Sequence, residues 1–377
     1  MVTRRNLLKL GALGAGLVTL PQIGFAAGAD TPKKFLFVIQ RGAADGLATL
    51  APIGDAAYRG LRGEEAERVG EGVAIGSDFA LHPSLERVAA MHGKGDARFV
   101  HAVASPYRDR SHFDGQNVLE TGGAQAYAVK DGWVNRLLGA LPGTRAVALA
   151  PALPVALRGP VAAASFAPSR LPDATANLMA RVGNLYAEDP ELGPMWEQAE
   201  AVRGMAGDVA NARDGAAMGE LAANLMTGPD GASIVMVETD GWDTHYQQAG
   251  RLGRALTGLD ALLGGFEAAM GDEWSDTLVI VATEFGRTAA LNGTNGTDHG
   301  TASMAMLLGG AVKGGDVLAD WPGLKRNALY QGRDLMPTLG LDALIASALA
   351  QHFGIDDAGA LLFPQTRPDL MRETLIG

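Results

Sequence analysis

The sequence of 377 residues contains no cysteine. This absence excludes disulfide bonds, a thiol nucleophile and thiolate metal ligands. Aromatic residues make up only 6% of the chain, and the five tryptophans show no ordered stacking pattern. Basic residues are outnumbered too, because 31 lysines and arginines stand against 42 acidic residues, which gives a net charge of −11. A chain with this charge is not expected to bind nucleic acid.

The N-terminus has the composition of a targeting signal. A pair of arginines, Arg4 and Arg5, precedes an apolar, glycine-rich stretch at 10–23, and small residues follow it. This order is typical of a twin-arginine export signal. The stretch is shorter than the ~20 residues of a membrane span, so we expect no stable membrane anchor. We predict that residues 1–29 are read by the twin-arginine translocase, and that the mature protein is periplasmic or extracellular.

The remaining chain, residues 30–377, alternates short apolar runs with amphipathic segments. Such alternation predicts an α/β fold with a mostly parallel sheet sandwiched by helices. We expect strands at 34–40, 98–103, 145–150, 233–238, 278–282 and 304–309, and helices at 83–92, 132–141, 251–270 and 341–353. Residues 54–80 are polar and glycine-rich, which predicts a loop with one short helix. Leucine, methionine and alanine at helical spacing predict a helical insertion at about 176–226.

Polar side chains follow several of the predicted strands. They lie at 41–45, 111–114, 240–245, 284–287 and 298–299. Open α/β sheets keep their chemistry at the carboxyl ends of the strands. The sequence therefore predicts that these five segments lie along one edge of the sheet.

Side chains that bind metals recur at these positions. Asp240, Asp243 and His245 fall within six residues, and two carboxylates with an imidazole suit zinc, manganese or magnesium. A polar turn that caps the next helix has the same composition, and turns, caps or surface ion pairs would also explain the other sites. The full set of predicted ligands is Asp45, Asp240, Asp243, His245, Glu284, Asp298 and His299.

Four further residues are candidates for catalysis. Ser111 has its simplest role as a helix N-cap, but a nearby cation and the helix dipole could activate its hydroxyl. His112 could bind metal, orient Ser111 or pack. One or two divalent cations beside a hydroxyl suit phosphoryl or sulfuryl transfer, in which Arg41 or Arg287 would hold the anion.

Several motifs along the chain resemble those of a known family. They are RGAADGL (41–47), RSHFDGQNVLETGG (110–123), VETDGWDTH (237–245), TEFGRT (283–288), GTDHG (296–300), VKGG (312–315), DWPGL (320–324) and GRDL (332–335). Together they resemble the bacterial secreted family known as domain of unknown function 1501, which is similar in fold to the alkaline phosphatase and sulfatase superfamily. The resemblance implies an α/β sheet with a two-metal site.

The resemblance also implies roles for individual residues. The Asp240 to His245 segment resembles the cluster for one metal, to which His299 with Asp298 would add. Glu284 falls where an aspartate of the second site ends its strand, and Ser111 lies near the position of the nucleophile.

The sequence departs from the superfamily at three points. Phe285 replaces a common histidine, and Asp45 lies several residues beyond the usual aspartate of the first strand. The lack of cysteine excludes a cysteine-derived formylglycine.

These observations predict an exported metal-dependent hydrolase that cleaves a phosphate or sulfate ester of a small molecule or polymer. The alternative is a non-catalytic periplasmic binding or accessory protein that retains the fold. Turnover of an ester would separate the two.

Overall fold

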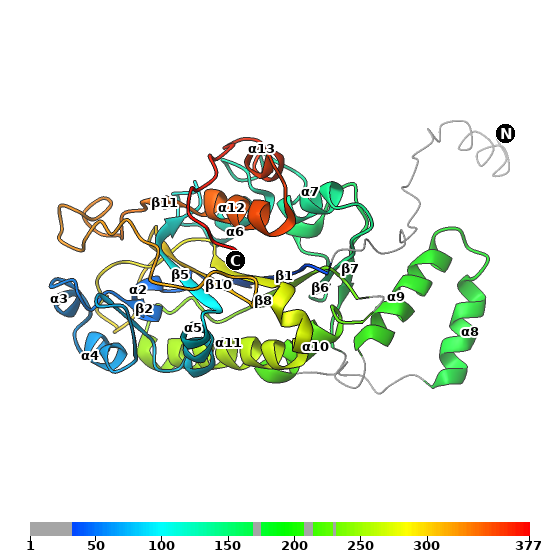
Figure 1. Ribbon diagram of the computed structural model, residues 1–377, viewed down its shortest axis with the longest axis horizontal. Helices are drawn as coiled ribbons and strands as arrows, with labels where there is room; N and C mark the ends of the chain where they lie inside the picture. Colours follow the sequence, from blue (N-terminus) through cyan, green and yellow to red (C-terminus); the bar gives the residue numbers. More distant parts are fainter. Residues whose placement is uncertain (1–31, 169–174, 207–213, 229–230) are drawn as a thin grey trace, which may run out of the picture.

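The computed structural model describes residues 32–168, 175–206, 214–228 and 231–377 (Figure 1). The predicted twin-arginine signal, residues 1–29, lies outside the described residues. Within the part that is described, no helix combines the length and the apolar character needed to cross a membrane.

An eight-stranded sheet forms the centre of the fold. In the described part of the chain, β10 alone runs against the other strands of this sheet and is antiparallel to both of its neighbours, β5 and β9. The order across the sheet is β11 (Leu339–Gly340), β5 (Ala97–Ala104), β10 (Ser303–Leu308), β9 (Thr277–Thr283), β1 (Lys34–Gln40), β8 (Ile234–Thr239), β6 (Ala146–Leu149) and β7 (Ala164–Phe166). This arrangement confirms the predicted α/β fold with a mostly parallel sheet.

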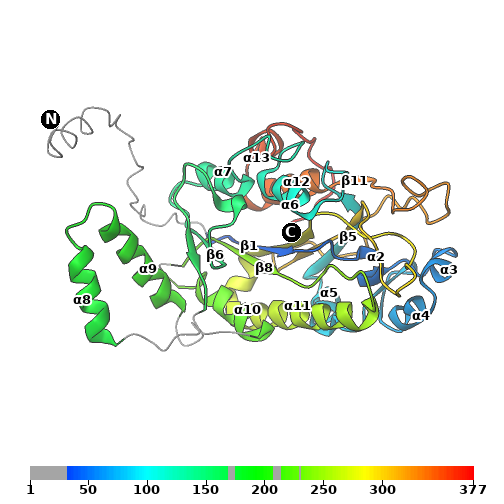
Figure 2. The same cartoon turned by 180° about the vertical axis from the view of Figure 1, so that it is seen from behind.

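Helices cover both faces of the sheet, as the two opposite views show (Figures 1 and 2). One face carries α5 (Glu86–Lys94), α10 (Gly215–Asn224) and α11 (Gln248–Met270), and the other carries α6 (His112–Thr121), α7 (Trp133–Ala140), α12 (Leu341–Phe353) and α13 (Ala358–Leu362). The central strand β1 is buried along its whole length, so both of its faces need a covering layer of helices. Leu36 and Val38 pack toward α11, whereas Phe35 and Phe37 pack toward α7.

Two smaller units lie at opposite ends of the sheet (Figure 1). At one end, residues 54–80 form more regular structure than the sequence predicted. This end contains α2 (Gly46–Thr49), α3 (Tyr58–Arg62), α4 (Glu64–Gly70) and a small antiparallel sheet of β2 (Leu50–Ala51), β4 (Phe79–Leu81) and β3 (Val73–Ile75). The predicted short helix is present as α4, but the rest of the segment is not a simple loop, because buried Ile75 and Phe79 give the short strands an apolar face.

At the opposite end, α9 (Leu192–Ala206) packs against the edge strand β7, and α8 (Ala176–Tyr186) lies beyond it, away from the sheet. The third helix of the segment 176–226, α10, packs on α11 instead and so belongs to the helical layer. The assignment of this segment as an insertion stays a prediction. The described residues also include two short 3-10 helices, η1 (Val155–Leu157) and η3 (Gly271–Asp276).

The direction of the strands decides where their loops meet. Gln40 at the end of β1 pairs with Thr239 of β8 on one side and with Thr283 of β9 on the other. These parallel strands therefore reach the same edge together with β5. Because β10 is antiparallel, its first residue, Ser303, starts at that edge. The loops after β1, β5, β8 and β9 and the loop before β10 carry the five polar segments.

Buried histidines make the stability of this fold depend on pH. His101 on β5 is fully buried; its Nε2 lies 3.0 Å from the carbonyl oxygen of Leu50, and its Nδ1 accepts from the amide of Ala102 at 2.8 Å. Burial lowers the pKa of His101 from its usual 6.5 to about 4. The unfolded chain therefore binds one more proton than the folded chain between these two pH values.

We expect His101→Gln to weaken the acid dependence of stability. In the wild-type protein, this group lowers the free energy of unfolding by up to ~1.4 kcal/mol for each pH unit between about 6.5 and 4. The variant lacks this contribution, and urea unfolding at a series of pH values would measure the difference. Equal slopes for wild type and His101→Gln would contradict the assignment.

Candidate metal centre

Five polar side chains converge at the edge where the strands end. His112 begins α6 in the connection after β5, and Glu284 directly follows β9. Asp243 and His245 lie in the loop after β8, and His299 lies just before β10. Residues that are far apart in the sequence thus meet because parallel strands share one edge and β10 is reversed.

Glu284 anchors one side of this cluster. It is fully buried, and its Oε1 accepts a hydrogen bond from Nδ1 of His112 at 2.8 Å. The same oxygen accepts from the amides of Gly42 at 2.9 Å and Ala43 at 3.1 Å. Both of these residues have positive φ, 117° and 59°, so their successive amides form an anion-binding nest. Glycine is required at 42, because a Cβ there would lie 2.8 Å from the backbone nitrogen of Asp243.

The charge of Glu284 determines which ring nitrogen of His112 carries the proton. Burial alone would raise the pKa of Glu284, but the hydrogen bond from His112 and the nest amides lower it. The hydrogen bond to Glu284 raises the pKa of His112, against the effect of burial. Because an ionised carboxylate only accepts, Nδ1 of His112 is the donor. Its Nε2 is buried and makes no hydrogen bond within the described residues.

The other two histidines have the same arrangement. Nδ1 of His299 donates to the carbonyl oxygen of Arg110 at 2.9 Å, and Nδ1 of His245 lies 3.2 Å from Oδ1 of Asp298. Their Nε2 atoms are 3.0 Å apart. Each also lies close to Oδ1 of Asp243, at 3.2 Å for His299 and 3.0 Å for His245.

Nε2 of each of the three histidines therefore lies within 3.5 Å of Oδ1 of Asp243. Nε2 of His112 is 3.5 Å from Oδ1 of Asp243, and the donor atoms of His112, Asp243 and His299 lie within 4.8 Å of one another. Ligands around a four-coordinate zinc ion at ~2.1 Å would be about 3.4 Å apart, which is close to the distances from the three Nε2 atoms to Oδ1 of Asp243. His245 lies near Asp243 and His299 but outside the group of three whose donor atoms are all within 4.8 Å of one another. Carboxylates or carbonyls that hold the opposite ring nitrogen are typical neighbours of metal-binding histidines.

Arg287 holds the carboxylate of the cluster in place. Its Nη1 donates to Oδ1 of Asp243 at 2.7 Å, while its Nε and Nη2 donate to the hydroxyl and the carbonyl of Thr297. Burial would raise the pKa of Asp243, but this bond and the charge of Arg287 lower it. The guanidinium is buried and makes three hydrogen bonds, one of them to Asp243, so it orients this carboxylate.

Phe285 forms a wall of the cluster. Its ring stacks on His112 with centroids 5.1 Å apart and an interplanar angle of 24°, and it lies 5.4 Å from the ring of His299. The aromatic side chain at this position limits the rotation of both imidazoles.

Two predicted ligands lie apart from the cluster. Asp45 is buried and caps α2, and its carboxylate accepts from Arg62 at 2.6 and 3.1 Å and from Gln248 at 2.7 Å. Burial would raise the pKa of Asp45, but Arg62 lowers it. Asp240 is exposed, and its side chain makes no hydrogen bond or ion pair with any described residue.

The predicted catalytic residues differ in their surroundings. Arg41 lies between two carboxylates, with Glu120 at 2.9 Å and Glu238 at 2.5 Å, so its charge is already matched. Ser111 is the N-cap residue of α6, but its hydroxyl makes no capping hydrogen bond. It directly precedes His112 in the chain, which places it at the rim of the cluster.

Sequence analysis missed several supporting residues. Gln116, one helical turn after His112, donates to Oε1 of Glu284 at 3.3 Å, and the four-residue spacing could have revealed it. Asn292 donates to Oδ1 of Asp298 at 3.1 Å. No local pattern marks Asn292, because its partners follow from the folded course of the loop.

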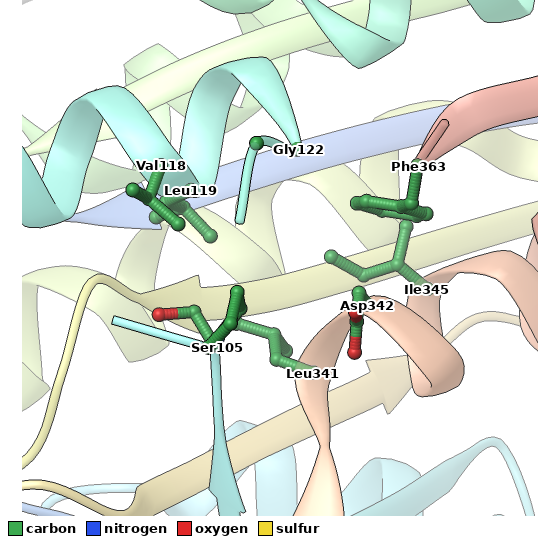
Figure 3. A pocket seen from close by; sticks show the side chains of 10 residues that line it. Ser105, Val118, Leu119, Gly122, Leu341, Asp342, Ile345 and Phe363 are labelled. Atoms are coloured by element: carbon green, nitrogen blue, oxygen red, sulfur yellow. The ribbon is translucent and has the colours of Figure 1, made fainter. Parts of the chain in front are cut away.

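A small pocket lies between α6, α12 and Phe363 (Figure 3). It is lined mainly by apolar side chains, including Leu119, Leu341, Ile345 and Phe363. Ser105 borders both regions, since its hydroxyl lies 3.4 Å from the carbonyl oxygen of Glu284. The pocket contains none of the histidines.

The fold and the cluster define an α/β protein with a candidate divalent-metal centre at the carboxyl edge of its sheet. The chain belongs to the family described as protein of unknown function (DUF1501), whose family model matches residues 32–362. This match confirms the family inferred from the motifs. Among proteins with curated descriptions, no significant match was found.

Three solved structures show a distant likeness. A Bacteroides thetaiotaomicron protein labelled 4S-sulf, from a locus for glycosaminoglycan metabolism, is 10% identical, with 89% of this chain and 74% of that chain covered and a TM-score of 0.41. The periplasmic domain of EcEptC from Escherichia coli is 9% identical, with 92% of each chain covered and a TM-score of 0.39. Alkaline phosphatase from the Antarctic bacterium TAB5 is 12% identical, with 74% and 91% covered and a TM-score of 0.36. Scores this low support no argument about activity.

We expect Arg62→Met to destabilise the protein by ~3–5 kcal/mol, because it leaves the buried carboxylates of Asp45 and Glu65 without their common cation. Urea unfolding would measure the loss. Arg59→Met is the matched control, since Arg59 is exposed on the same helix and its removal should change stability by less than ~0.5 kcal/mol. Wild-type stability in Arg62→Met would show that these carboxylates do not need the ion pair.

Proposed function

We propose that the protein is an exported, metal-dependent hydrolase that cleaves a phosphate or sulfate ester of a small molecule or polymer. The divalent cation is bound by four side chains, those of His112, Asp243, His245 and His299. Glu284 and Asp298, which the sequence also predicted as ligands, instead orient the histidines. Three nitrogen donors with one oxygen suit zinc better than manganese or magnesium.

One observation carries this proposal: three Nε2 atoms point at one carboxylate oxygen while each Nδ1 is occupied by an acceptor. Nε2 of His112 is buried without a hydrogen-bond partner among the described residues, and Nε2 of His245 and of His299 lie 3.0 Å from each other, so a cation would satisfy all three nitrogens. Asp45 and Asp240 are left out of the ligand set, because Asp45 is bound to Arg62 and Asp240 is exposed and unpaired among the described residues.

A bound zinc ion would polarise the ester and lower the pKa of a nearby hydroxyl or water. Ser111 remains the proposed nucleophile. Its hydroxyl makes no capping hydrogen bond to α6 within the described structure, and it lies at the N-terminus of this ten-residue helix, where the helix dipole stabilises negative charge. The adjacent His112 fixes the position of this residue relative to the cation.

The substrate anion requires a different arginine from those predicted. Arg41 and Arg287 are already paired with carboxylates. Arg110 and Arg333 share a single buried carboxylate, that of Asp334, which leaves one net positive charge. Arg333 also donates to the carbonyl oxygen of His299, so its guanidinium lies beside the cluster. We assign the binding of the ester oxygens to Arg333, supported by Arg110.

Export rests on the sequence alone. The paired arginines and the apolar stretch of residues 1–29 support passage through the twin-arginine translocase to the periplasm or beyond. The ester class rests on the resemblance of the motifs to the alkaline phosphatase and sulfatase superfamily.

The ligand set predicts the effect of two substitutions on metal content. His245→Ala removes one of four donors and should weaken zinc binding at least ~100-fold, as measured by elemental analysis and by competition with a chromophoric chelator. Asp240→Asn, at an exposed position three residues before Asp243 in the same loop, should bind zinc like the wild type. Loss of zinc in Asp240→Asn with retention in His245→Ala would refute the assignment.

The assignment of Arg333 predicts weaker anion binding. Arg333→Gln should raise the Kd of the zinc-loaded protein for inorganic phosphate about 10-fold, because it removes one charge-assisted contact, and should leave the zinc content unchanged. Isothermal titration calorimetry measures this change. Arg326→Gln, at an exposed position in the same segment, should bind phosphate like the wild type. An unchanged Kd in Arg333→Gln would exclude the role.

The non-catalytic alternative makes a different prediction. An accessory protein would bind zinc without hydrolysing aryl phosphates or aryl sulfates with any metal, and it would bind a specific exported partner. Turnover that is lost together with zinc in His245→Ala would support the hydrolase.

A further inference from the structure

We propose that Gln248 is a positioning residue for the metal centre, and that its buried amide holds together the two loops that carry most of the cluster. The inference rests on the proposed centre. Gln248 is the first residue of α11 and is fully buried. Its side chain makes four hydrogen bonds, which satisfy both amide protons and both lone pairs of the oxygen.

The amide oxygen joins the two loops. It accepts from the hydroxyl of Thr244 at 2.7 Å and from the hydroxyl of Thr297 at 2.5 Å. Thr244 lies between Asp243 and His245 in the sequence, and Thr297 directly precedes Asp298 and His299. One oxygen atom thus fixes the distance between the segments on both sides of the proposed cation.

The amide nitrogen sets the orientation of Gln248. It donates to Oδ2 of Asp45 at 2.7 Å and to Oε1 of Glu65 at 2.9 Å. Both carboxylates are buried and paired with Arg62. A flipped amide would turn its oxygen toward two carboxylates, so only one orientation is possible. Asp45, which the sequence predicted as a ligand, therefore does not contact the centre. It orients Gln248, which in turn holds the threonines next to the ligands.

The connection continues to the carboxylate ligand. The hydroxyl of Thr297 that donates to Gln248 also accepts from Nε of Arg287 at 3.1 Å. Arg287 in turn donates to Oδ1 of Asp243 at 2.7 Å. A displaced Thr297 would shift Arg287 and with it the carboxylate oxygen that all three histidines face.

The backbones of the two loops are equally close. The amide of Gln248 donates to the carbonyl of Asn295 at 2.8 Å, and the amide of Thr297 donates to that of Thr244 at 3.1 Å. Gly296 is required there, because a Cβ would lie 2.2 Å from the backbone of His245. These contacts hold the loops in register, and the Gln248 side chain adds the link to the buried charges.

The test compares Gln248→Met with Gln247→Met in the full-length protein. Methionine has a similar length but no hydrogen-bonding amide, and Gln247 is the exposed neighbour on the chain. Zinc Kd values are measured by chelator competition at a temperature at which circular dichroism shows each protein folded. We expect a 10- to 100-fold weaker Kd for Gln248→Met and the wild-type value for Gln247→Met.

Substitution with cobalt separates positioning from a general loss of stability. The visible absorption of bound Co²⁺ reports the geometry of its ligands, so Gln248→Met should change the band positions or intensities even at saturating metal. Thr297→Val, which removes one hydroxyl of the same path, should change the spectrum in the same direction and serves if Gln248→Met does not fold.

The outcomes are distinguishable. An unchanged Kd and an unchanged cobalt spectrum in Gln248→Met, or in Thr297→Val if only that variant folds, would overturn the role of Gln248 and leave the metal centre intact. Failure of the wild-type protein to bind either Zn²⁺ or Co²⁺ would overturn the centre and this inference together.

Discussion

The hydrogen bond between Glu284 and His112 joins residues 172 positions apart, and the geometry of the cluster depends on it. Glu284 can be fully buried as an ion because the nest of Gly42 and Ala43 supplies two amides to the same oxygen. A buried carboxylate without such donors would cost several kcal/mol. The end of β1 therefore stabilises the end of β9, which then orients the first residue of α6.

The reversed strand β10 also helps to bring distant residues into the cluster. A wholly parallel sheet would have to bring His299 to the shared edge at the end of a strand. Because β10 runs the other way, the chain instead passes along that edge first, through the loop 292–299, and then enters the sheet at Ser303. The loop can then lie directly against the loop after β8, where glycine at 296 permits backbone contact.

The sequence predicted the sheet well because each central strand is a short apolar run. It also predicted which segments would meet, since strand ends of parallel sheets coincide. It could not assign the partners of individual charges. From the sequence, Asp45 is suitable as a metal ligand, but in the folded protein it forms an ion pair with Arg62. Arg41 is suitable for binding an anion, but in the folded protein it forms ion pairs with Glu120 and Glu238. Such pairings depend on packing between distant segments, which local patterns do not encode.

The position of β1 has a consequence for how the chain folds. The first strand to be synthesised lies between β8 and β9, so Phe35 pairs with Ile234 on one side and with Leu278 on the other. Closing loops of this length is entropically costly and slow, and the sheet centre cannot form until more than two thirds of the protein has left the ribosome. During that interval, the uncovered apolar surface of β1 is open to wrong partners, so a cell that makes this protein benefits from shielding its nascent chain.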